Sequence, residues 1–384
     1  MQLRKLFDSV TRTPSTSFAS FQIPEDCVLD TGTAGQGAGF VPEETYFEIR
    51  LSQLHLQYGR EYWRQFIPLA SLMTQFLYAG ERRTVPFLVG PELLASVSQL
   101  DKRNYVEFRN VRVAGPFPYA GDDLELFAGL FRVVTSDWAG PVLSLLETMT
   151  KAFDLSKLSS FVSVAEPLVS GIEGLLGMRD VELRMAMYHQ LANPSGETAQ
   201  RYQGSVLKPG FQVLIGAVGE SERQALRVRD GILWRCDDSG GLAEFREADF
   251  LLFEMVPLLS RPDYTTFDFH KIYWPKVVDH IWNGNPEAAR KTLRLLATSL
   301  AGCQDITGPH RKRLLAMYLK KFEEETAAEQ LLDEEGGKQG FEETPRSALS
   351  EADLRTAVET GERSPATASA ESYQPETILA ELGI

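Results

Sequence analysis

Alternating apolar and polar residues predict a β-strand in the segment "TYFEIRLSQLHLQY". The apolar residues first occupy odd-numbered positions, at Phe47, Ile49 and Leu51, and then an even-numbered one, at Leu54. Every second side chain of a half-buried strand points to the same face of its sheet. A change of parity within one strand therefore predicts a β-bulge, which we place near Gln53.

Two further groups of predicted strands lie at residues 105–134 and 202–256. In the first group, Pro, Gly and a pair of Asp residues separate the apolar runs, which is typical of turns. In the second group, alternating apolar residues flank Asp230-Gly231 on both sides. This pair favours a type I′ hairpin turn, because both central residues can adopt positive φ at low cost.

A helical period interrupts the predicted strands at residues 136–178, which indicates an α-hairpin inserted into a β scaffold. In its second half, apolar residues cover most of the helix circumference. Such a helix is either packed on nearly all sides or contacts a membrane or a partner, and we favour packing. In the alternative, the membrane or partner surface would consist of Leu168, Val169, Ile172 and Leu175.

A second helical block follows the strands, at residues 263–330, and predicts a small helical bundle. One of its helices has Asn285 as its N-cap and Pro286 at its first helical position. Gly302 is expected to end this helix.

Beyond Phe322 the composition changes to Glu, Ala, Ser, Thr and Gly, with few large apolar residues. Such a segment buries too little surface to offset the entropy lost on ordering, so we predict a disordered acidic tail. The end of the chain restores an apolar motif that, as a helix, would form one narrow face suited to a groove on a partner. The predicted partner-binding residues are Ile378, Leu379, Leu382 and Ile384.

These patterns together predict an α+β protein with an antiparallel β-sandwich-like body. Residues 1–44 form an N-terminal segment with a glycine-rich loop, and residues 45–262 form a β-rich domain that contains the helical insertion. Residues 263–330 form the helical bundle, and residues 331–384 form the tail.

The net charge of −14 comes mostly from the tail. Residues 323–384 contain sixteen acidic and four basic residues, a net charge of −12, which leaves −2 for the rest of the chain. A nearly neutral body without a basic stripe does not favour nucleic-acid binding, which depends on clustered positive charge.

The sequence shows neither a secretory signal nor an apolar run of transmembrane length, so we expect a cytoplasmic protein. Cys27, Cys236 and Cys303 are far apart and have none of the spacings typical of zinc or iron–sulfur sites. We expect reduced thiols, no metal site and no cofactor.

Asp30-Thr31-Gly32 and Asp238-Ser239-Gly240 resemble the motif of aspartic peptidases, in which two carboxylates share one proton. Each match covers only three residues. The second is preceded by "RCD", where that family has apolar strand residues. We therefore interpret both segments as loops.

In the absence of a catalytic constellation, we expect a non-catalytic interaction or accessory protein of an intracellular assembly. It would dock a protein partner through its C-terminal tail. Two alternatives stay open: a membrane-active effector that uses residues 136–178, and an unrecognised hydrolase whose catalytic groups meet only in the fold.

Overall fold

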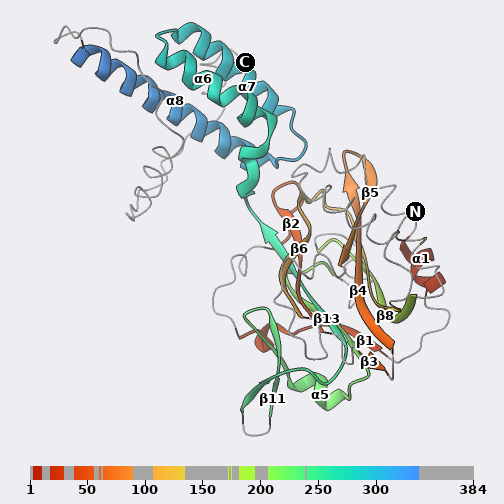
Figure 1. The fold of residues 1–384 in the computed structure, drawn as a ribbon. Helices are drawn as coiled ribbons and strands as arrows, with labels where there is room; N and C mark the ends of the chain where they lie inside the picture. The colour runs from red at the N-terminus through yellow and green to blue at the C-terminus, as the bar shows by residue number, and fades with distance from the viewer. Residues whose placement is uncertain are drawn as a thin grey trace. The chain divides into compact units, whose positions relative to one another are not determined.

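The structure is a computed structural model. It divides the chain into unit 1, Met1–Phe267 with Cys303–Arg311, and unit 2, Asp268–Gly302 with Lys312–Ile384 (Figure 1). The residues that it describes are 3–10, 18–29, 39–55, 60–61, 64–89, 107–134, 172, 174, 181–194, 206–237 and 240–336.

Unit 1 contains two five-stranded antiparallel sheets. The first has the order β1 (Phe18–Gln22), β9 (Gly210–Gly216), β13 (Phe250–Leu258), β2 (Tyr46–His55) and β6 (Glu107–Pro118). The second has the order β3 (Arg60–Glu61), β4 (Arg64–Tyr78), β7 (Leu124–Val134) and β8 (Val181–Leu191), and β5 (Glu81–Val89) also pairs with β4.

A smaller sheet accompanies them, formed by β10 (Leu226–Arg229), β11 (Ile232–Cys236) and β12 (Leu242–Glu244). Short helices of unit 1 include α1 (Leu3–Val10), α5 (Glu220–Ala225), and the 3₁₀ turns η1 (Glu25–Cys27) and η3 (Pro262–Thr266).

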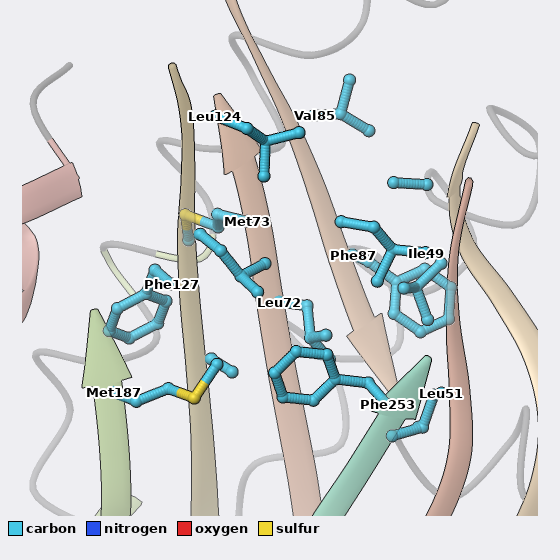
Figure 2. Packing of buried hydrophobic residues seen from close by; sticks show 14 of the residues in the cluster. Ile49, Leu51, Leu72, Met73, Val85, Phe87, Leu124, Phe127, Met187 and Phe253 are labelled. Carbon is cyan, nitrogen blue, oxygen red and sulfur yellow. The ribbon is translucent and has the colours of Figure 1, made fainter. Parts of the chain in front are cut away.

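The main core of unit 1 lies between the two large sheets, where side chains from both belong to one cluster. Figure 2 shows Leu51 and Phe253 from the first sheet together with Leu72 and Phe127 from the second. The other face of the first sheet packs in a separate cluster with residues of the small sheet, such as Leu233. The first sheet is therefore covered on both faces, which confirms a sandwich-like body.

Local backbone features in unit 1 agree with the sequence patterns. Where β13 pairs with β2, Leu252 lies opposite Gln53, but the next residue, Phe253, lies opposite Leu51. Strand β2 therefore has one extra residue at this point, which confirms the predicted bulge. Asp230 and Gly231 have φ of 54° and 68°, and they join β10 to β11 as the predicted hairpin.

Unit 2 contains a short π-helical turn, η4 (Phe269–Tyr273), followed by α6 (Trp274–Trp282), α7 (Pro286–Ala301) and most of α8 (Gly308–Gly336). The Asn285 side chain accepts a hydrogen bond of 3.2 Å from the Ala288 N–H, so the predicted N-cap is confirmed. Tyr318 of α8 is fully buried, and its ring contacts those of Phe269 and Trp274.

The α+β fold class is confirmed by antiparallel sheets followed by a small helical part. Helix α8 continues to Gly336, past the predicted end of the bundle at residue 330, because Ala, Glu, Gln and Leu in that segment favour helix. Within the predicted insertion at 136–178, only Ile172 and Gly174 are described, and both are helical. Residues 337–384 lie outside the described residues.

Candidate functional site

A cleft of about 570 Å³ lies on unit 1. Its walls come from four segments that are distant in sequence: residues 42–44 before β2, the β4–β5 turn, residues 118–120 at the end of β6, and residues 304–311 at the start of α8. All four segments belong to unit 1.

Two of the walls are built by tight turns. The β4–β5 hairpin closes through Ala79 and Gly80, whose φ values of 54° and 80° match a two-residue hairpin loop. On another side, the Glu43 N–H donates a hydrogen bond of 2.7 Å to the Tyr119 carbonyl. A Cβ on Gly121, which has a φ of 90°, would lie 2.8 Å from the Pro42 Cβ, so glycine is needed for this close approach.

Arg261 anchors the segment that enters α8. Its side chain is 1% exposed and donates two hydrogen bonds of 2.8 Å to the Asp263 carboxylate. A third, of 3.1 Å, goes to the backbone carbonyl of Asp305. The Asp305 carboxylate in turn accepts a hydrogen bond of 3.0 Å from the Tyr78 hydroxyl at the end of β4. These bonds fix the segment before α8 to the strands of unit 1.

Tyr46 fixes the first turn of α8 to the start of β2. Its buried hydroxyl accepts a hydrogen bond of 2.9 Å from the Thr307 N–H and makes another of 2.9 Å with Nδ1 of His310. Both Tyr46 and His310 are buried. The side of the cleft formed by α8 is therefore rigidly attached.

Three residues that line the cleft have buried polar atoms without a hydrogen-bond partner among the described residues: Tyr119 Oη, Thr307 Oγ1 and Arg311 Nε. A different nitrogen of Arg311, Nη2, donates hydrogen bonds to the backbone carbonyls of Cys303 and Ile306. Buried polar groups are normally paired, and an unpaired one costs about 1–3 kcal/mol. These three atoms have almost no exposed surface of their own, so they lie behind the wall of the cleft.

Charge around the cleft is mixed. Burial raises the pKa of Tyr119, and the negative charges of Asp123 and Asp122 raise it further, so its hydroxyl keeps its proton. The lining includes the exposed carboxylates of Glu43 and Glu44 as well as the Arg311 guanidinium. The lining of the cleft thus carries charged side chains of both signs, which can bind a polar molecule.

Within the described ranges, no group of three or more His, Cys, Asp or Glu side chains has a geometry that would hold a metal ion. None of the helices in those ranges combines the length and the apolar composition needed to span a bilayer.

The predicted partner-binding residues Ile378, Leu379, Leu382 and Ile384 lie outside the described residues, and so do Leu168, Val169 and Leu175 of the alternative surface. The fourth member of that surface, Ile172, is 0% exposed and belongs to the main core of unit 1.

Asp30 and Asp238 of the peptidase-like motifs also lie outside the described residues. Next to the second motif, the Asp237 carboxylate accepts a hydrogen bond of 2.7 Å from the Gly241 N–H. This bond closes the turn between β11 and β12.

A second surface feature belongs to unit 2. Among the described residues, the exposed large hydrophobic side chains of unit 1 are Leu29, Val41, Leu242 and Leu259. Unit 2 is the smaller unit, yet it has more of them: Ile272, Trp282, Leu295, Leu331 and Leu332.

The sequence patterns did not reveal the cleft, because no lining segment contains a recognisable motif.

Comparison of the chain with protein-family models, with curated proteins and with solved structures finds no match.

Proposed function

We propose that this chain is a non-catalytic interaction or accessory protein of a cytoplasmic assembly, and that unit 2 with its C-terminal tail docks a protein partner. The observation that carries the proposal is the concentration of exposed apolar side chains on unit 2. Single exposed apolar residues are common on any protein. The support therefore lies in their number, which is five on the smaller unit against four among the described residues of unit 1.

Two helices of unit 2 carry three of these side chains. On α7, Leu295 is 49% exposed and shares the exposed side of the helix with Arg290, Lys291 and Arg294. On α8, Leu331 and Leu332 are 64% and 56% exposed. These two leucines lie in the last turns before the tail begins, so they and the tail are adjacent in the chain.

The tail supports the same function through its sequence. Its acidic residues repel one another, which favours an extended spacer that lets a short motif search the volume around its anchor. In a helix, Ile378, Leu379 and Leu382 would share one face, and Glu376 and Glu381 would lie beside it. The partner is therefore expected to offer an apolar groove with basic residues at its edge.

The test compares the partners that co-purify with the wild type and with three variants in the native host. Deletion of residues 373–384 is expected to remove at least one partner and to leave the Tm of unit 1 unchanged. The double variant Leu379→Asp with Leu382→Asp should reproduce the deletion, because charges on the apolar face prevent its burial in a groove.

The matched control is Thr377→Asp with Ala380→Asp, which adds the same charge to the opposite helix face. It should retain every partner. If the deletion, the face variant and the control all give the same partner list as the wild type, the tail is only a solubilising appendage and the proposal is wrong.

A further inference from the structure

We propose that the exposed face of α7 is an interaction surface and that, in the absence of a partner, it is occupied by residues 376–384 of the same chain. The apolar motif of the tail would then be held on unit 2 until a partner displaces it. This inference rests on the proposed function, since it assigns a resting position to the motif that docks the partner.

The first step of the argument concerns the charge on α7. Arg290, Lys291 and Arg294 are all exposed, and none of them forms an ion pair with another described residue. The one acidic residue of α7, Glu287, lies in the first turn. Like charges one turn apart, such as Arg290 and Arg294, repel each other, and a carboxylate bound between them relieves this repulsion. The exposed face of α7 therefore favours an acidic ligand.

The second step concerns the apolar contacts that this face offers. Leu295 is 49% exposed, follows Arg294 directly and lies one helical turn after Lys291. Ile272 is 45% exposed and belongs to η4, which packs against α7. Apolar and basic side chains thus adjoin on α7, which suits a ligand that combines apolar side chains with carboxylates.

The third step concerns the tail, whose sequence supplies such a ligand. In a helix, Ile378, Leu379 and Leu382 would share one face, with Glu376 on one side of it and Glu381 on the other. Residues 364–384 contain three acidic residues and no basic one, so this part of the tail is not repelled by α7.

The fourth step concerns the connection between the motif and α7. Residues 337–375 number 39, and their composition predicts a flexible coil with a root-mean-square length of about 35 Å. Helix α8 has 29 residues and is about 44 Å long, which sets the scale of distances within unit 2. A linker that matches such a span gives a local motif concentration on the order of 1 mM. At about 10 µM protein, the motif of a second copy is roughly a hundredfold more dilute, so the chain's own motif is the favoured occupant.

The ligand arm of the test uses a synthetic peptide of residues 373–384, with isothermal titration calorimetry on full-length chains. The tail variant, Leu379→Asp with Leu382→Asp, cannot cover α7 with its own motif and should bind the peptide with a Kd of about 1 mM or tighter. In the wild type the chain's own motif competes, so the same peptide should bind at least about twofold more weakly. Equal affinity for both chains would contradict occupancy by the chain's own motif. No heat from either chain at up to about 10 mM peptide would overturn the surface itself.

The protein arm adds Arg290→Glu with Arg294→Glu to the tail variant and should weaken peptide binding by about fivefold or more. Lys276→Glu with Lys312→Glu is the matched control, because it makes the same change of charge at exposed residues of α6 and α8. The control should stay within about twofold of the tail variant. Equal weakening by both pairs would contradict the assignment to α7.

Loss of folding is excluded by the Tm, which exposed substitutions on α7 should leave close to that of the tail variant. If the charge reversal lowers the Tm, Arg290→Gln with Arg294→Gln takes its place, because it removes the positive charges without adding negative ones. Unaltered peptide affinity in a folded α7 variant would overturn the proposal.

The position of the tail in the full-length chain is measured by photo-cross-linking. Tyr373→p-benzoylphenylalanine places the reactive group beside the motif and leaves the motif intact. Irradiation should link it to α7 or η4 within one chain, and Arg290→Glu with Arg294→Glu should remove most of this product. A mixture of ¹⁵N-labelled and unlabelled chains identifies links between two copies, which would overturn the assignment to the same chain.

Failure of this inference is distinguishable from failure of the docking proposal. The α7 variants keep the tail intact, so they should retain every partner that the tail docks. A partner list that depends on the tail, without a contact between the tail and α7, would reject only the resting position. A contact with α7 in a chain whose partner list does not depend on the tail would reject only the docking proposal.

Discussion

Unit 1 and unit 2 leave different kinds of chemical groups without a partner. In unit 1, apolar side chains fill two clusters, one on each face of the first sheet, and the unpaired groups at the cleft are polar. In unit 2, the Tyr318 ring contacts that of Phe269, and five large apolar side chains are exposed, against four among the described residues of the larger unit 1. We propose that the second pattern serves to bind a protein partner.

The largest difference between the units is expected for ion pairs. Asp263→Ala leaves Arg261 almost fully buried without its carboxylate partner, and should lower the free energy of unfolding by about 3–5 kcal/mol. In unit 2, Lys320 and Glu324 form an exposed pair at 3.6 Å, and Glu324→Ala should cost at most about 0.5 kcal/mol. Urea unfolding of both variants checks the contrast, which equal losses would contradict.

The next effect concerns apolar side chains. Ile172→Ala removes a fully buried side chain from the main core, and cavity formation should lower the free energy of unfolding by about 2–5 kcal/mol. Leu331→Ala changes a side chain that is 64% exposed and should stay within about 0.5 kcal/mol of the wild type. A neutral Ile172→Ala would revive the hypothesis that the segment around it faces a membrane or a partner.

A smaller loss is expected at the N-cap of α7. Asn285→Ala removes the hydrogen bond to the Ala288 N–H and should destabilise unit 2 by about 1 kcal/mol. Circular dichroism during urea unfolding measures this loss. Asn285→Asp, which keeps an acceptor oxygen, should retain most of the stability that Asn285→Ala loses. If Asp and Ala were equally destabilising, the cap would not depend on its side chain.

The smallest effect is a pH dependence that both units share. Burial lowers the pKa of His189 in unit 1, and burial together with the positive charge of Lys321 lowers the pKa of His270 in unit 2. The unfolded chain then binds protons more readily than the folded one, so stability is full above about pH 6.5 and falls as the pH drops below it.

Unfolding in urea at pH 7.5 and pH 5.5 tests this dependence. His270 makes a hydrogen bond of 2.7 Å with the Tyr318 hydroxyl, and His270→Gln keeps a polar side chain there without a titrating group. The variant should lose less stability than the wild type between the two pH values. An unchanged difference would mean that His270 does not contribute.

Local features of the fold were predictable because a few neighbouring residues determine them. The bulge near Gln53 follows from a parity change within one strand, and the turn at Asp230-Gly231 follows from the preference of these residues for positive φ. The N-cap at Asn285 is equally local.

The cleft was not predictable, since its geometry depends on contacts between distant segments. The sequence grouped residues 263–330 into one bundle, whereas unit 1 includes residues 303–311. That segment is held by Tyr46 and Tyr78, which are more than two hundred residues away and match no motif. The unpaired hydroxyls are visible only once all of these contacts are known.

The most direct test of this division of roles is quantitative affinity purification of four proteins in parallel: the wild type, Leu379→Asp with Leu382→Asp, Thr377→Asp with Ala380→Asp, and Tyr119→Phe. We predict that only the first variant loses a partner, because the tail docks it and the cleft does not. An identical partner list for all four proteins, or an equal loss in the Tyr119→Phe variant, would contradict the account.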